Sequence, residues 1–264
     1  MKQIIPILIL VLVLANGSPA NSLAPEADRF YALRGTDFNE ETLLASSTNI
    51  DKAIALYIQA IENTSGSEKE EITWKLIRAY HFKGRYTTSD RKTRKSIYDK
   101  AIKIGAEAIK QFPESAGIHV WMALVWGAWA QEHGAFKAAR KGVAGKIKEH
   151  CEKAIELDET FDEAAPYRVL GTVHLRAPKI PLILRWPSKK RAVELLQKAY
   201  EIAPQNLFTR QFLAEALYER DQKRRAMELM EEILKTDGVV RGVVEDAMVK
   251  KEAAAILRKW KKEG

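Results

Sequence analysis

The chain has 264 residues, of which 46% are hydrophobic and 30% are charged, and its formal net charge is +8. This composition is typical of a helix-rich globular protein and excludes a chain that is disordered over most of its length. The single cysteine, Cys151, excludes an internal disulfide framework, so the apolar core must hold the fold.

Residues 1–20 are predicted to be a targeting segment. Lys2 precedes the apolar run Ile4–Ala15, and small residues follow that run as far as Ala20. The run is shorter than a membrane-spanning helix, which needs about 20 residues, and its flanks fit a signal peptide that is cleaved after Ala20. We therefore expect an exported protein, periplasmic or secreted, without a lipid anchor because no cysteine lies near the cleavage site. An uncleaved signal anchor is the alternative.

A spacing of small and large residues recurs along the rest of the chain. In "AVELLQKAYEIAP", the residues Ala192, Leu196 and Ala199 are four and three positions apart. The same spacing recurs, with substitutions, at Ala53–Tyr57–Ala60, Ala101–Gly105–Ala108, Ile147–Cys151–Ala154 and Ala226–Met230–Ile233. Each segment follows a partner with a large–small pair such as Leu170–Gly171. Small residues let two helices approach closely and large residues fill the space beside them, which predicts pairs of packed helices.

The period of these pairs identifies the repeat. Ala226 follows Ala192 by 34 residues, the length of a tetratricopeptide (TPR) helix–turn–helix unit. We therefore predict an all-α fold, a TPR solenoid of five helix pairs between about residues 26 and 237. The main part of the solenoid is assigned to residues 49–240.

The two ends of the solenoid are predicted separately. Residues 21–48 form a polar N-terminal segment with one short helix near residues 26–34. Residues 241–264 contain the amphipathic stretch "VEDAMVKKEAAAILRKWKK" and are expected to form a C-terminal capping helix.

Two repeat units are longer than the consensus. The extra residues lie around Gly134–Gly145 and Leu175–Ser188, in both cases between the first and the second helix of a unit. Because the two inserts share a place in the repeat, we expect them to emerge at the same edge of the solenoid.

Aromatic residues in and beside these inserts are the candidate binding residues. The stretch "HVWMALVWGAWAQEH" holds Trp121, Trp126 and Trp129 on one predicted helix, and the proline-rich loop "PKIPLILRWP" holds Ile183 and Trp186. The three tryptophans either fill the core or line an apolar channel or groove. The loop either packs on the solenoid or forms a functional lip of an opening.

The sequence lacks the common catalytic, cofactor-binding and metal-binding motifs. The five histidines lack metal-ligand spacing, and the sequence has no nucleophile elbow, phosphate loop or dinucleotide fingerprint. We therefore expect no metal, no cofactor and no enzymatic activity. Cys151 occupies the large-residue position of a second helix, where it should be buried. Nucleic acid is not expected as a partner of an exported chain.

The middle of the chain resembles the regulator of microtubule dynamics family. The resemblance rests on "SAGIHVWMALVWGAWAQEHGAFKAARKGVAGKIKEHCEKAIELD", on "YRVLGTVHL", and upstream on "ITWKLIRAY" and "YDKAIKIGAEAI", and it covers about Glu71–Leu234. It implies helical repeats without catalytic residues. A eukaryotic member is associated with phospholipid binding and organelle contact, which implies a hydrophobic ligand as one hypothesis; microtubule binding is not expected of an exported protein.

A weaker resemblance is to the T component associated with tripartite (TRAP) periplasmic transporters. Those are exported TPR proteins with similar inserts and a hydrophobic channel, and they are usually lipoproteins, whereas this chain lacks the required cysteine. The leading functional hypothesis is a non-enzymatic scaffold that binds a protein or peptide on its concave face. The alternatives are a carrier of a hydrophobic small molecule or lipid, possibly transporter-associated, and an enzyme of unrecognised type.

Overall fold

The fold of the chain is all-α. The computed structural model describes residues 20–178, 180 and 184–263, so the predicted targeting segment lies outside the described residues except for Ala20. Within the described part the helices are α1 (Ala20–Ala32), α2 (Thr48–Glu62), α3 (Gly66–Tyr86), α4 (Arg91–Gln111), α5 (Ala116–His133), α6 (Ala135–Arg140), α7 (Val143–Asp158), α8 (Phe161–Arg176), α9 (Lys189–Ile202), α10 (Leu207–Tyr218), α11 (Lys223–Lys235) and α12 (Val243–Glu263). The predicted all-α class is confirmed.

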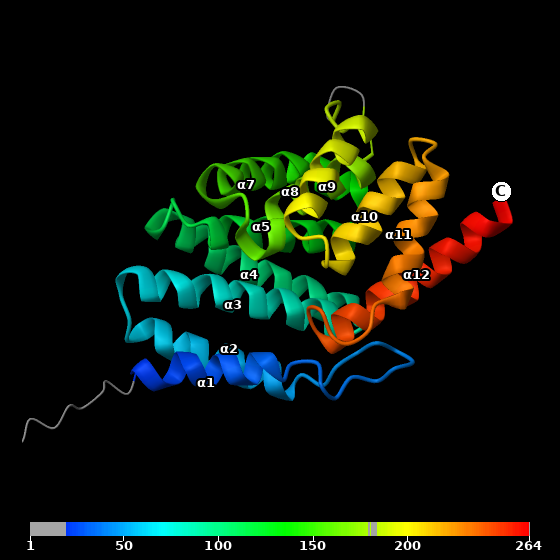
Figure 1. Cartoon of the computed structure of the whole chain (residues 1–264). Helices are drawn as coiled ribbons and strands as arrows, with labels where there is room; N and C mark the ends of the chain where they lie inside the picture. The colour runs from blue at the N-terminus through cyan, green and yellow to red at the C-terminus, as the bar shows by residue number, and fades with distance from the viewer. Residues whose placement is uncertain (1–19, 179, 181–183, 264) are drawn as a thin grey trace, which may run out of the picture.

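The helices form a succession of pairs that stack into a solenoid (Figure 1). The pairs are α1/α2, α3/α4, α5/α7, α8/α9 and α10/α11, and each packs against the next. Five helix pairs are therefore present as predicted. The first pair begins earlier than expected, because α1 starts at Ala20, whereas the short helix of the polar N-terminal segment was predicted near residues 26–34.

The repeat positions form the contacts between paired helices. Tyr57, Cys151, Leu196 and Met230 are fully buried at equivalent places in their second helices. Burial raises the pKa of the Cys151 thiol, so this side chain behaves as a small apolar group at neutral pH. At Gly171, an added Cβ atom would lie 2.7 Å from the Cγ atom of Leu196, so a small residue is required where α8 meets α9.

Both inserts lie between the first and the second helix of a unit. The first contains the short helix α6, and the second is the segment between α8 and α9, of which residues 179 and 181–183 are outside the described part. First helices of successive antiparallel pairs run in the same direction, so both inserts leave their units at the same end.

The last helix, α12, packs on the final pair and also turns back toward the beginning of the chain. Its apolar residues Val249, Ala253 and Leu257 join the core formed by α10 and α11, and the ring of Trp260 stacks on Tyr218 with centroids 4.0 Å apart. Its first turn lies beside the end of α1 (Figure 1). The C-terminal segment therefore caps the stack and bridges back to the first pair. None of the described helices is long and apolar enough to cross a membrane.

The packing at Gly171 gives a stability prediction with an internal control. We expect Gly171→Leu to lower the free energy of unfolding by about 1–3 kcal/mol or more, because the added side chain overpacks the contact with Leu196. The same substitution at Gly127 should be tolerated, because a Cβ atom there meets nothing within 4 Å. Urea denaturation of both variants measures the difference, and equal effects at the two glycines would contradict the helix-pair assignment.

Candidate functional site

The first helices of all five pairs converge on one cavity. Its volume is about 190 Å³, and it is partly open to solvent. A cavity of this size has room for roughly six water molecules or for about one or two ligand side chains. It is lined by Tyr31 of α1, Arg78, His81, Phe82, Arg85 and Tyr86 of α3, Trp121, Ala123, Leu124, Gly127, Ala128 and Gln131 of α5, Ile147 of α7, Arg168, Val169, Thr172, Val173 and Arg176 of α8, Phe208 and Phe212 of α10, and Arg241 and Glu245 of the C-terminal segment.

Aromatic rings form much of the cavity wall. Phe82 and Tyr86 contribute rings from α3, with centroids 5.0 Å apart, and Phe208 and Phe212 contribute a second pair from α10, with centroids 6.4 Å apart. Gly127 leaves open space between these walls, because nothing lies within 4 Å of the position that its Cβ atom would occupy. The cavity therefore offers apolar surface to a ligand at both of its sides.

The polar part of the lining is strongly basic. In the described part of the chain, the lining contains five arginines and only one carboxylate, that of Glu245. That carboxylate is already engaged, because Oε1 of Glu245 accepts hydrogen bonds from the guanidinium of Arg34. A cavity with this balance attracts groups of negative charge.

Arg241 is held in place by two carboxylates at the start of α8. Its Nη2 atom lies 2.7 Å from Oδ2 of Asp162, and its Nη1 atom lies 3.4 Å from Oε2 of Glu163. Burial alone would lower the pKa of Arg241, but these carboxylates, Asp162 foremost, raise it by more. The guanidinium therefore stays charged although it is largely removed from water.

The turn that carries these carboxylates has an unusual backbone. Asp162, Glu163 and Ala164 have φ angles of 50°, 60° and 57°, in the left-handed region that residues with a Cβ atom rarely adopt. The turn directs Asp162 and Glu163 toward Arg241, and Glu163 also accepts a hydrogen bond from the side-chain amide of Asn206. The ion pairs thus offset local strain at the edge of the cavity.

The positive charges of Arg168 and Arg85 are less well compensated by carboxylates. Arg168 is 5% exposed, its nearest carboxylate oxygen is Oδ2 of Asp162 at 3.9 Å, and its Nη1 atom donates to the carbonyl of Glu163. Burial lowers the pKa of Arg168 to about 10, and the neighbouring Arg241 contributes to this lowering. Arg85 donates to the hydroxyl of Tyr86 and to the amide oxygen of Gln131.

Several buried polar atoms of the lining lack a hydrogen-bond partner within the described chain. They are the indole Nε1 of Trp121, the Nε of Arg78 and the Oε2 of Glu245. A buried polar atom without a partner costs roughly 1–3 kcal/mol, so native proteins leave few of them. Here two donors and one acceptor belong to residues of the same cavity.

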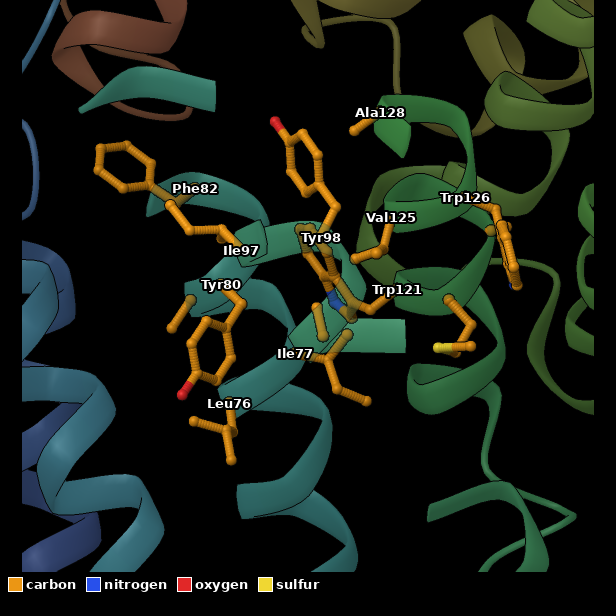
Figure 2. Packing of buried hydrophobic residues seen from close by; sticks show 14 of the residues in the cluster. Leu76, Ile77, Tyr80, Phe82, Ile97, Tyr98, Trp121, Val125, Trp126 and Ala128 are labelled. Carbon is orange, nitrogen blue, oxygen red and sulfur yellow. The ribbon is translucent and has the colours of Figure 1, made fainter. Parts of the chain in front are cut away.

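The predicted tryptophans divide between the cavity and the core. Trp121 lines the cavity on the side of α5 that faces α3, with its ring 5.7 Å from that of His81, whereas Trp126 points away from that interface (Figure 2). Trp129 donates a hydrogen bond from Nε1 to Asp99 and stacks on His133. All three rings are buried, and only Trp121 is part of the cavity lining.

The loop residues lie elsewhere. Ile183 is outside the described residues. Trp186 is half-buried, its ring lies 4.8 Å from that of His174, and the Nζ atom of Lys148 lies 5.6 Å from its centroid. It is not among the residues that line the cavity. A binding role for Trp126, Trp129, Ile183 or Trp186 stays a prediction.

The arginines of the cavity were not predicted from the sequence. They are hidden among the many charged residues of solvent-facing helices, and nothing in the composition separates them. Their spacing is the signal that was available: Arg78 and Arg85 are seven residues apart in α3, and Arg168 and Arg176 are eight apart in α8. Such spacings place both side chains on one face of a helix.

Comparison with known proteins defines the class first. The tetratricopeptide repeat model matches residues 190–239. A solved structure of a thermophilic TPR protein from Thermus thermophilus superposes with a TM-score of 0.61 and 14% sequence identity, over 90% of this chain and 99% of that one. The chain is therefore a TPR protein.

The family follows from the longer match. The model of the family "Regulator of microtubule dynamics protein 1-3" matches residues 39–185, which is more than half of the chain, and the chain belongs to this family. Regulator of microtubule dynamics protein 3 of Mus musculus and that of Rattus norvegicus are each 29% identical to it over 150 residues, 56% of this chain. The match spans 30% of the length of these relatives.

Two half-buried histidines give a prediction of pH dependence. Burial foremost, then the charges of Arg85 and Arg241, lower the pKa of His81 to about 3, and burial together with His119 lowers that of His150 to about 4. In the unfolded chain these groups titrate near pH 6.5. The unfolded state therefore takes up protons that the folded state does not, and stability is lost as the pH falls from about 6.5 toward 4.

Urea denaturation at pH 7.5 and at pH 5.0 tests this pH dependence, because ordinary carboxylates stay ionised over most of this interval. We expect a lower free energy of unfolding at pH 5.0, and a smaller loss in the variant His81→Gln. Equal stability at the two pH values would show that the folded protein does not hold these histidines in neutral form.

Trp186→Ala tests the role of the second insert. We expect it to lower the free energy of unfolding, because the ring packs on His174 and Lys148, but by less than the roughly 3–5 kcal/mol of a fully buried ring. Arg185→Ala, at the exposed neighbouring position, is the control. Unchanged stability with weaker binding of a partner would instead support the predicted lip.

Proposed function

We propose that this protein is a non-enzymatic binding module whose cavity holds a segment of a partner protein. TPR folds generally mediate interactions between proteins, and the finer assignment to this cavity rests on one observation. A single cavity receives residues from the first helix of every pair, so a ligand there is within reach of all five pairs.

The residue types of the lining support a protein ligand. Trp, Tyr and Arg side chains dominate binding energy in protein interfaces, because they combine large apolar surfaces with hydrogen-bond donors. The cavity has these types in Trp121, Tyr31, Tyr86 and the arginines. A side chain of the partner that enters the cavity would be removed from water on several sides, as anchor residues in interfaces are.

A second candidate is a hydrophobic small molecule or lipid. The enclosed aromatic surfaces of Phe82, Phe208 and Phe212 favour it, as does the family resemblance. Export to the periplasm or cell exterior, and association with a transporter, stay predictions from the sequence.

Filling the cavity tests both candidates. Gly127→Leu places a side chain in the open space beside α5, so we expect it to reduce recovery of partner proteins by tagged protein at least tenfold relative to wild type. Gly145→Leu in α7 is the matched control, because a Cβ atom there also meets nothing within 4 Å and the residue does not line the cavity.

Two outcomes decide between the candidates or against both. Bound lipid in native mass spectra of the wild type that is lost in Gly127→Leu would favour the lipid candidate. Equal recovery of the same partners by the wild type and both variants would contradict a role for the cavity.

A further inference from the structure

We infer that the cavity has an anion subsite, built on Arg78, Arg85 and Arg168, that takes carboxylate side chains of an extended acidic segment of a protein. This inference rests on the proposed function and adds the chemistry of the ligand. It starts from the imbalance of charge in the lining, where five arginines face one carboxylate that is already paired with Arg34.

The arginines differ in how much charge compensation the folded chain gives them. Arg241 and Arg176 each have a carboxylate oxygen at 2.7 Å, on Asp162 and Glu215. The distances are longer for the others: Arg168 reaches a carboxylate only at 3.9 Å and Arg78 only at 4.0 Å. These less compensated cations are the ones to which an added anion contributes most.

Arg85 is the least compensated cation of the set. Its hydrogen bonds go to a phenol, an amide and the sulfur of Met248, and no carboxylate lies within 4 Å of it in the described chain. A guanidinium that is held by neutral acceptors keeps donors for a bidentate carboxylate.

The spacing of the cations favours an extended chain over a compact anion. Arg78 and Arg85 are seven residues apart on α3, which is about 10.5 Å along the helix. A segment in the extended polyproline II conformation covers a similar distance in three residues, at about 3.1 Å per residue, and its three residues per turn bring side chains three positions apart to the same face. Acidic residues three positions apart would therefore reach both arginines, whereas a single phosphate group would reach only one of them.

The unpartnered atoms of the lining also match a peptide. Trp121 Nε1 and Arg78 Nε need acceptors, and Glu245 Oε2 needs a donor. A peptide backbone carries both carbonyl oxygens and N–H groups, while a phosphate or a fatty-acid carboxylate has only acceptors. The aromatic pair Phe208 and Phe212 supplies an apolar surface for a side chain between the acidic ones.

The direct test uses two synthetic peptides and the full chain. The acidic probe is acetyl-Ala-Asp-Phe-Ala-Asp-Phe-Ala-amide, and the neutral probe has Asn at both Asp positions. We expect titration calorimetry to show at least tenfold tighter binding of the acidic probe, with an affinity that falls as salt is added. Equal affinities for the two probes, or no binding of either, would overturn the inference.

Variants locate the subsite. Arg85→Gln and, as a second variant, Arg78→Gln should each weaken the acidic probe at least fivefold while circular dichroism shows an unchanged fold. Arg225→Gln removes the same charge from α11 outside the cavity and should bind as wild type does. Wild-type affinity in both cavity variants would overturn the inference.

Further measurements distinguish this inference from membrane binding and from the proposed function. Binding to phosphatidylcholine vesicles that contain phosphatidic acid, with no binding of the acidic probe, would overturn a peptide subsite. If Gly127→Leu loses its protein partners but neither probe binds the wild type, the inference fails and the proposed function stands. If the acidic probe binds but Gly127→Leu keeps all partners, the proposed function fails.

Discussion

The ion pairs of Arg241 with the start of α8 hold the C-terminal segment where it closes one side of the cavity, because Arg241 and Glu245 of that segment are part of the lining. Arg241 lies just before α12, and the carboxylates of Asp162 and Glu163 hold it across a distance of almost eighty residues in the chain. The same segment is tied to the end of α1 through Arg34 and Glu245. Breaking one partner of such a largely buried pair typically costs about 3–5 kcal/mol, so these contacts constrain the whole C-terminal segment.

This closure is accompanied by backbone strain in three residues next to the cavity. The three residues Asp162–Ala164 adopt left-handed backbone angles without a glycine among them. Strain of this kind persists only where surrounding contacts over-determine it, and it concentrates at functional sites. Here the contacts are the ion pairs to Arg241, so the strained turn, the return of the C-terminal segment and the basic cavity depend on one another.

The parts of the fold that could be predicted from the sequence are those set by local spacing. The small and large residues at Ala192, Leu196 and Ala199 specify a helix face, and the same rule located the second helix of every pair. The arginine lining of the cavity was not predicted, because the inward direction of Arg85 or Arg168 depends on how successive pairs are rotated in the stack. The three tryptophans illustrate the same limit: they share one helix, and only Trp121 reaches the cavity.

A double-mutant cycle between Arg241 and Asp162 tests the closure most directly. Arg241→Met removes the guanidinium, and Asp162→Asn removes the charge while keeping a residue type that tolerates left-handed angles. Free energies of unfolding of the wild type, both single variants and the double variant give the coupling between the two side chains. We predict a coupling of at least about 1.5 kcal/mol, as for hydrogen-bonded charged groups in contact. Additive effects, to within about 0.5 kcal/mol, would contradict the closure.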